Sequence, residues 1–173
     1  MRMTPSKGLL SIIASRGNMG SPNKLDRASL RRARDLMLKQ GEIPMGYLVS
    51  TVLTRSWRRS VDAGLVPDGR LPDPGRLSDS ELVRITERQH ELIAHARPVM
   101  EYLHAQTRNS GSMIILSDDK GVLLQALGDP DFLTRAERVT LSPGASWNER
   151  HRGTNAIGTA LAEGLPVVVH GGE

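Results

Sequence analysis

The residues best suited to chemistry in this sequence lie between Trp147 and His170. In this stretch an aromatic residue, several ionisable residues and two glycines precede a segment of good helix formers, and three valines follow it. This order predicts a loop, then a short helix from residue 154, and then a buried strand at residues 166–170. The loop and the start of the helix are therefore the first candidates for a functional site.

The start of this predicted helix carries polar residues that can cap it or bind a ligand. Asn155 or Thr154 can accept a hydrogen bond from the first turn, and Gly164 lies where a C-terminal cap is expected. Backbone N–H groups at a helix start attract anions, so a polar ligand can bind there beside Arg150 and Arg152. A capped connecting helix that binds nothing explains the same residues equally well.

Two glycines in this stretch have the spacing of a phosphate-binding loop. Gly153 and Gly158 match Gly-x-x-x-x-Gly, which nucleotide-binding proteins follow with Lys and then Ser or Thr. Here the next residues are Thr159 and Ala160, which lack the lysine that reaches the phosphates. We therefore expect no ATP hydrolysis at this loop.

Two unusual motifs, one in each half of the chain, occur in the order found in one known family. The first motif is Arg55-Ser-Trp-Arg-Arg-Ser60, with Ala-Gly-Leu-Val-Pro67 after it. The second is Trp147-Asn-Glu149 and Gly153-Thr-Asn-Ala-Ile-Gly-Thr-Ala160, with Pro-Val-Val-Val-His and Gly-Gly-Glu after it. Together they resemble the GAF-type sensor region of bacterial sigma-54-dependent transcriptional activators of the Fis family, in the acetoin-catabolism regulator group.

This resemblance implies an α+β fold, in which an N-terminal helical region precedes a partial GAF domain with an antiparallel sheet flanked by helices. It covers roughly residues 45–173 and ends within that domain, so the chain resembles a fragment. The family contacts DNA and the sigma-54 RNA polymerase through domains that this chain lacks. The implied function is to bind a small-molecule effector in the cytoplasm and to control transcription.

The resemblance places the effector beside the second motif, where five residues are candidate contacts. Trp147 would form an apolar wall, and Glu149 or Arg150 would be a polar handle. Thr154 and Asn155 would offer amides and side chains. In the structural alternative, Trp147 lies in the core and Glu149 pairs with an arginine. A ligand-free dimerisation module is a further alternative function.

The composition excludes several classes of protein and leaves one more alternative open. The chain has 173 residues and no cysteine, so disulfides and cysteine metal sites are impossible. Residues 1–76 contain 14 Lys and Arg against 6 Asp and Glu, a net charge of +8, whereas residues 77–173 contain 9 against 13, a net charge of −4. The basic half makes direct DNA binding an alternative. With no nucleophile beside a base and no metal-ligand set, we expect neither an enzyme nor a cofactor.

The expected organisation follows the chain in order. Residues 1–20 are expected to be a disordered tail, and residues 21–64 a helical region. A linker rich in proline and glycine at residues 65–77 precedes the partial GAF-like domain at residues 78–173. No apolar run approaches the about 20 residues of a membrane span, so we expect no membrane contact.

Two amphipathic helices are predicted in the helical region. One covers residues 21–40 and begins with a Ser-Pro pair, and the other covers residues 44–64 and begins with a proline. Trp57 is expected to anchor the second helix in the core, with Arg58 and Arg59 exposed beside it. Since Trp57 lies late in its helix, whereas a recognition helix reads bases from its beginning, a helix-turn-helix is not expected.

Residues 78–105 are expected to form one long helix that begins with a Ser-Asp-Ser-Glu capping box. Pro98 should kink or divide this helix, because proline lacks the backbone donor. The apolar stripe of the helix can pack on the sheet or on a second copy, so we expect a homodimer through it. The stripe comprises Leu82, Ile85, Gln89, Leu92, Ala96, Val99 and Leu103.

Two apparent metal sites are explained without a metal. His90 and His95 nearly match the zinc motif His-Glu-x-x-His, but a spacing of five residues separates them by roughly 140° around a helix. Asp118 and Asp119 lie between two apolar runs, where they are expected to be turn residues and not calcium ligands.

The apolar runs on either side of these acidic residues predict a β-hairpin. Residues 112–116 and 122–126 would be its strands. A short helix is expected after Gly128, and a brief strand at residues 139–141.

Overall fold

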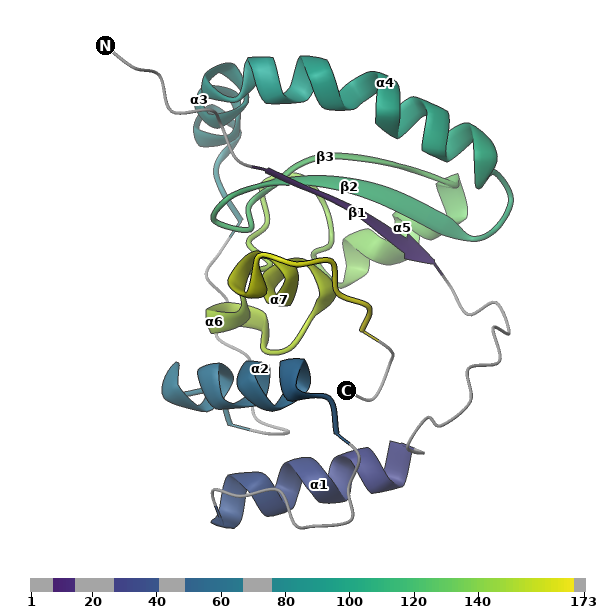
Figure 1. Ribbon diagram of the computed structural model, residues 1–173. Helices are drawn as coiled ribbons and strands as arrows, with labels where there is room; N and C mark the ends of the chain where they lie inside the picture. The colour runs from purple at the N-terminus through teal and green to yellow at the C-terminus, as the bar shows by residue number, and fades with distance from the viewer. Residues whose placement is uncertain (1–7, 15–26, 41–48, 67–75, 170–173) are drawn as a thin grey trace. The chain divides into compact units, whose positions relative to one another are not determined.

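A computed structural model describes residues 8–14, 27–40, 49–66 and 76–169 of the protein (Figure 1). The chain divides into two compact units. The sheet unit comprises residues 1–17 and 74–147, and the helical unit comprises residues 18–73 and 148–173. This division differs from the expected sequential one, because residues 148–173 cluster with the N-terminal helices.

The sheet unit is built on three antiparallel strands, β1 (Gly8–Ala14), β2 (Ser112–Asp118) and β3 (Leu123–Gly128), in the order β1-β2-β3. The expected hairpin is confirmed as β2 and β3, with Ile115 opposite Ala126. Every residue of β2 is buried, as expected for an apolar strand at the centre of a sheet.

Strand β1 corrects the expectation that residues 1–20 form a disordered tail. All seven of its residues pair with β2, beginning with Gly8 opposite Asp118. A buried central strand needs backbone hydrogen-bond partners along both edges, and β1 supplies them along one. The approach is close at Gly8, since a Cβ atom there would lie 2.8 Å from the carbonyl oxygen of Ser117.

The turn after β2 is held by an acidic side chain, as expected. The carboxylate of Asp118 accepts the backbone N–H groups of Lys120 at 2.9 Å and Val122 at 2.8 Å. Burial raises the pKa of Asp118 above its ordinary value, and these two hydrogen bonds act in the opposite direction. Asp118 is thus a turn residue.

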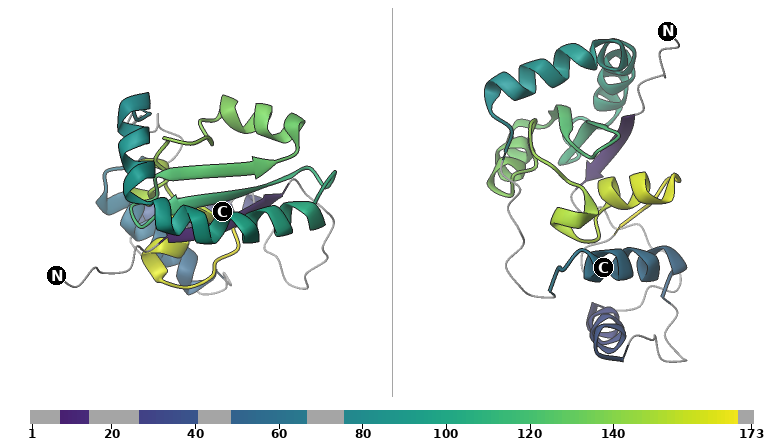
Figure 2. Two further views of the ribbon diagram at one scale, coloured as in Figure 1. Left: turned by 90° about the horizontal axis from the view of Figure 1, so that it is seen from above. Right: turned by 90° about the vertical axis from the view of Figure 1, so that its left-hand side faces the viewer.

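Helices α3 (Asp79–Arg88) and α4 (His90–Gln106) pack on the sheet and point in different directions (Figure 2). They were expected as one helix that Pro98 kinks or divides. The division lies instead at Gln89, whose backbone (φ −101°, ψ 15°) leaves the helical range and closes α3. Pro98 lies inside α4, on the exposed side of the helix. Because proline has no backbone N–H, one carbonyl group in the preceding turn lacks its helical donor, and water can reach that group.

The start of α3 confirms the capping box. The hydroxyl of Ser78 accepts the backbone N–H of Glu81, and the carboxylate of Glu81 accepts the backbone N–H of Ser78. The same carboxylate also accepts the hydroxyl of Ser78, and these hydrogen bonds hold the pKa of Glu81 below its ordinary value.

The apolar stripe of α3 and α4 packs on the sheet, the first of its two expected arrangements. Ile93 and Met100 are buried in a cluster with three residues of β2 and β3, namely Ile114, Leu116 and Leu124. Partly buried residues surround this cluster, namely Ile85, Leu92, Ala96, Leu103 and Leu127. Most of the stripe is therefore occupied within the chain and is not available to a second copy.

Helix α5 (Pro130–Arg138) follows β3 and contacts β2 and β3. The prediction of a strand at residues 139–141 is wrong. Val139 caps α5, and Thr140 has a φ of 56°. The backbone N–H groups of residues 139–141 donate to carbonyl groups at the end of α5, so they do not pair with a strand.

The helical unit contains α1 (Arg27–Gln40), α2 (Thr51–Asp62), α6 (Glu149–Arg152) and α7 (Ala156–Glu163). Helix α2 begins at Thr51, after Ser50, whose side chain accepts the backbone N–H of Val52. The expected starts of the two helices, at residues 21 and 44, lie outside the described residues.

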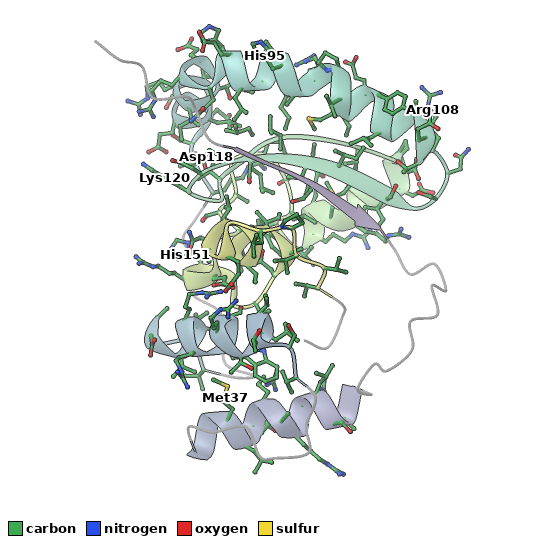
Figure 3. All side chains as sticks on the ribbon, viewed as in Figure 1. Met37, His95, Arg108, Asp118, Lys120 and His151 are labelled. Carbon is green, nitrogen blue, oxygen red and sulfur yellow. The ribbon has the colours of Figure 1, made fainter. Side chains whose placement is uncertain are left out.

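Trp57 anchors α2 in a core with α1, as expected. Its side chain is only 4% exposed and packs with Ala33, Met37 and Leu53. Figure 3 shows Met37 on the side of α1 that faces α2. Arg59, in contrast, is half-buried and not exposed as expected.

The strand expected at residues 166–170 does not form over the described residues 166–169. Val168 is 75% exposed, and no described strand pairs with this segment. Valines favour a strand only where neighbouring strands provide packing, so the three valines alone do not produce a strand here. Within the described ranges, no helix combines the length and apolar character needed to cross a bilayer.

Candidate functional site around Glu149

The second sequence motif folds into two short capped helices joined by a glycine turn. Asn148 caps α6 by accepting the backbone N–H of Arg150. Asn155 caps α7 by accepting the backbone N–H of Gly158 at 2.8 Å, and its amide donates to the carbonyl group of Gly153. Asn155, one of the two expected caps, and Gly164 at the far end of α7 are thereby confirmed.

Gly153 connects α6 to α7 with a backbone that other residues rarely adopt. Its φ of 67° and ψ of −160° lie in a region that is essentially restricted to glycine. We expect Gly153→Ala to lower the free energy of unfolding by about 1–3 kcal/mol, measured by urea denaturation. Gly164→Asn is the control, because asparagine tolerates the left-handed conformation of Gly164. An equal loss in both variants would contradict the assignment.

Glu149, the first residue of α6, is 4% exposed and is buried against α2. One carboxylate oxygen accepts the hydroxyl groups of Ser56 at 2.5 Å and Thr159 at 2.6 Å. The other accepts Nε of Arg59 at 2.6 Å. The buried carboxylate is therefore ion-paired and hydrogen-bonded on both oxygens, which offsets the free-energy cost of removing it from water.

Thr154 extends the same cluster of hydroxyl groups. Its Oγ1 lies 2.7 Å from Oγ of Ser56, which in turn bonds to Glu149. We call Ser56, Arg59, Glu149, Thr154 and Thr159 the Glu149 cluster. It joins α2 to α6, α7 and the turn between them.

A second carboxylate, Glu163 at the end of α7, binds the same helix α2. It is ion-paired with Arg55 and, at 2.8 Å, with Arg59, and its side chain is 6% exposed. Hydrogen bonds from Arg55 and then from Arg59 lower the pKa of Glu163 from 4.5 to about 2. Arg59 thus bridges the carboxylates of both short helices.

The lowered pKa of Glu163 predicts a pH dependence. Because the pKa is depressed in the folded state, the stabilisation is complete above about 4.5 and is lost as the pH falls through about 2. We expect the stability difference between the wild type and Glu163→Gln to be constant near pH 7 and to vanish toward pH 2. A titration of the Glu163 carboxyl group by NMR should give a midpoint of about 2. A midpoint at its ordinary value would contradict the ion pairs.

The five candidate ligand-binding residues lie in different environments. Trp147 belongs to the sheet unit, where its indole N–H donates to the carbonyl oxygen of Thr140 at 3.0 Å. The other four lie in the helical unit, and only Arg150 among them keeps an exposed side chain. The remaining three take part in the hydrogen bonds described above. The expected alternative that Glu149 pairs with an arginine is confirmed, and Arg59 is that arginine.

Ser56, Arg59 and Glu163 are site residues that were not predicted from the sequence. Ser56 and Arg59 belong to the first motif, so their place in a recognisable pattern was an available signal. Glu163 gave no such signal, because a glutamate in the last turn of a helix is ordinarily exposed to water.

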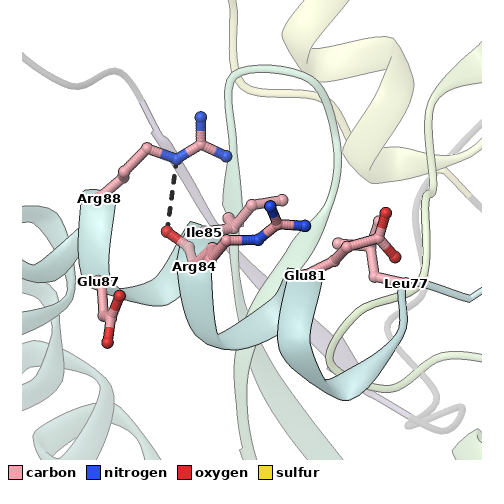
Figure 4. A pocket seen from close by; sticks show the side chains of 6 residues that line it. All are labelled: Leu77, Glu81, Arg84, Ile85, Glu87 and Arg88. Atoms are coloured by element: carbon pink, nitrogen blue, oxygen red, sulfur yellow. Dashed lines mark hydrogen bonds between the residues drawn. The ribbon is translucent and has the colours of Figure 1, made fainter.

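A surface depression of about 460 Å³ lies along α3 and is separate from the Glu149 cluster (Figure 4). Its lining comes from residues 77–88 alone and includes Glu81, the capping residue. No candidate ligand residue lines it. No group of three potential metal ligands occurs in the part of the chain that the structure describes.

Several known proteins similar to this chain are named as transcriptional regulators or activators. Residues 27–173 match the family described as MimR, N-terminal domain. The acetoin dehydrogenase operon transcriptional activator AcoR of Bacillus subtilis is 34% identical over 121 residues, which are 70% of this chain and 20% of that protein. The propane 2-monooxygenase operon transcriptional activator MimR of Mycolicibacterium smegmatis is 31% identical over 144 residues, 83% of this chain and 23% of that protein.

A solved structure has a similar fold. It is the crystal structure of the E. coli DhaR(N)-DhaL complex, with a TM-score of 0.61 and 19% sequence identity, covering 66% of this chain and 38% of that one. The likeness confirms the mixed helix and antiparallel-sheet class.

These findings define the class of the protein as an N-terminal regulatory region of transcriptional activators, whose relatives are regulators and not enzymes. The chain belongs to the MimR N-terminal domain family. The resemblance to sigma-54-type activators of the acetoin regulator group is thereby confirmed. The chain spans about a fifth of the length of the curated relatives it matches.

Proposed function

We propose that this chain senses a small metabolite and thereby controls a sigma-54-dependent transcriptional activator in the bacterial cytoplasm. The observation that supports the proposal is that the two family motifs, 93 residues apart at Ser56 and Glu149, meet in one buried cluster. The cluster ties α2 to the turn between α6 and α7. A ligand that shifts this turn therefore also changes the packing of α2, which provides a route for a signal.

The ligand is proposed to bind at the exposed side of this turn, with Arg150 as its polar handle. Glu149, Thr154 and Asn155 would hold the turn in place through the hydrogen bonds described above. Backbone N–H groups at the start of α7 would donate hydrogen bonds to acceptor atoms of the ligand. In this proposal, contact with DNA and RNA polymerase belongs to segments of the longer relatives that this chain does not span.

A thermal-shift screen of the full chain tests the proposal. The panel includes acetoin and propane, which occur in the names of the relatives. We expect at least one metabolite to raise the melting temperature as the site becomes saturated. At a hundredfold excess over Kd, binding should add about 2.7 kcal/mol to the free energy of unfolding. A panel without any such compound would favour a ligand-free dimerisation module.

Arg150→Ala tests the proposed contact. Because Arg150 is exposed, the variant should melt at the same temperature as the wild type without ligand. Loss of a charged hydrogen bond should weaken binding by about tenfold or more. Asp62→Ala, another exposed charge of the helical unit, is the control. Equal affinity in Arg150→Ala and the wild type would exclude Arg150 as a contact.

Direct DNA binding by the basic helices is the alternative that the charge distribution favours. Arg31 and Arg32 of α1 are exposed, and the opposite side of α1 packs on Trp57. This alternative predicts retention of the full chain on duplex DNA that falls steeply with salt and is lost in Arg31→Ser/Arg32→Ser. Retention of that kind would replace the sensing proposal with a DNA-binding one.

A further inference from the structure

The apolar side of α3 is only partly covered. None of the ten residues of this helix is buried, whereas α4 beside it buries Ile93 and Met100. The depression of about 460 Å³ lies along α3, and its apolar lining consists of Leu77 and Ile85, both half-buried (Figure 4). A volume of this size falls within the range of small-molecule sites, so an apolar group of a ligand can lie on this lining.

Two arginines of α3, one helical turn apart, line the same depression. Arg84 and Arg88 are both exposed. The guanidinium group of Arg88 donates from Nε to the carbonyl oxygen of Arg84 at 3.4 Å, and that of Arg84 donates to no described residue. Most of their N–H groups therefore have no acceptor among the described residues. Because like charges at this spacing repel each other, an anion that contacts both arginines relieves the repulsion.

The acidic residues of the lining do not serve as that anion. The carboxylate of Glu81 already accepts the backbone N–H and the hydroxyl of Ser78. Arg84 lowers the pKa of Glu81 less than these two hydrogen bonds do. Figure 4 shows the carboxylate of Glu87 directed away from both guanidinium groups. Cationic donors thus remain available beside an apolar surface.

We propose that this depression binds a small organic acid, with its carboxylate between Arg84 and Arg88 and its short apolar chain on Leu77 and Ile85. The planar guanidinium group donates two parallel hydrogen bonds to a carboxylate, which a free alcohol cannot accept in the same way. The apolar lining adds binding that inorganic phosphate cannot use. The site belongs to the sheet unit and is independent of the proposed metabolite site at Arg150, which belongs to the helical unit.

The open shape of the depression sets the expected affinity. Water reaches both arginines and screens their charges, so we expect a dissociation constant of about 1 mM. Complete burial of a methylene group strengthens binding by about fourfold. A chain that lies in an open depression buries about half of its surface, so we expect about twofold for each methylene.

An NMR titration of the full chain with hexanoate tests the proposal. Hexanoate should shift the backbone amide signals of α3 and the Nε–H signals of Arg84 and Arg88, with saturation. Butanoate, which is two methylenes shorter, should bind about fourfold more weakly. Hexanol and inorganic phosphate should each bind about tenfold more weakly or less. The double variant Arg84→Gln/Arg88→Gln should weaken hexanoate binding by about tenfold or more. Arg97→Gln, which changes an exposed arginine of α4, is the control and should bind as the wild type does.

The outcomes separate this site from the proposed metabolite site. All substituted side chains are exposed, so circular dichroism should show unchanged folding. The absence of saturable shifts in α3 up to about 20 mM hexanoate would overturn the proposal, as would equal affinity in the double variant and the wild type. Phosphate that binds as tightly as hexanoate would show a charged surface without a site for the apolar chain, which also overturns it. Shifts at the turn between α6 and α7 that Arg150→Ala removes report the metabolite site alone.

Discussion

Glu149→Ala is expected to lower the free energy of unfolding by about 3 kcal/mol. The substitution removes a buried carboxylate and leaves Arg59, Ser56 and Thr159 without their shared acceptor. The estimate is at the lower end for a broken buried ion pair, because the Arg59 side chain is 35% exposed and water can reach part of it. Urea denaturation followed by circular dichroism at pH 7 measures the loss.

Two variants define how much of this loss belongs to the charge and how much to burial. Glu149→Gln keeps the size of the side chain and one acceptor oxygen, so we expect an intermediate loss of about 1–2 kcal/mol. Asp62→Ala removes an exposed carboxylate from α2 and should change stability by less than about 0.5 kcal/mol. If Glu149→Ala changes stability no more than Asp62→Ala, the buried cluster does not stabilise the fold.

Trp57→Ala is expected to lower the free energy of unfolding by about 3–5 kcal/mol, which is the largest effect predicted for a single substitution. The indole is 4% exposed between α1 and α2, and its removal leaves a cavity lined by Ala33, Met37 and Leu53. A pair of helices with so few buried apolar residues cannot refill that volume, so we expect α1 to lose its helical structure first. Amide hydrogen exchange of α1 compared with β2 measures this order of loss.

Trp57→Phe is the matched control for this cavity. The substitution keeps an aromatic ring in the same core and should lower the free energy of unfolding by about 1–2 kcal/mol. Equal exchange rates for α1 in the wild type and Trp57→Ala would show that α1 does not depend on this contact. Val66→Ala removes an exposed apolar side chain of the same unit and should leave the exchange of α1 unchanged.

The features predicted correctly from the sequence are those that neighbouring residues decide. The capping box of Ser78 and Glu81, the cap at Asn155 and the glycine end of α7 each depend on hydrogen bonds within four residues. The hairpin of β2 and β3 follows from two apolar runs around a turn held by Asp118. Local chemistry was sufficient for these elements.

The errors concern contacts between distant residues. Residues 8–14 form β1 only because β2, a hundred residues later, offers an edge that needs hydrogen bonds. The reverse holds at residues 166–169, where a β-branched sequence has no described partner strand. Propensity is a weak guide wherever pairing decides the structure. The break at Gln89 likewise has no local signal, because the neighbouring residues Arg88 and His90 are neither glycine nor proline.

The candidate site was predicted in part for the same reason. The second motif was found, and pairing of Glu149 with an arginine was one of its two explanations. The sequence contains 23 lysines and arginines, however, and spacing alone does not select Arg59 from among them. The ion pair of Arg59 with Glu163 adds a contact across 104 residues that no local pattern encodes.

A double-mutant cycle on Arg59→Ala and Glu149→Ala tests most directly whether the two motifs form one cluster. Urea denaturation of the wild type, both single variants and the double variant gives the coupling free energy. Since the two side chains contact each other at 2.6 Å, we predict a coupling of about 1–3 kcal/mol. Losses that simply add, with a coupling within about 0.3–0.5 kcal/mol of zero, would contradict the direct contact between the motifs.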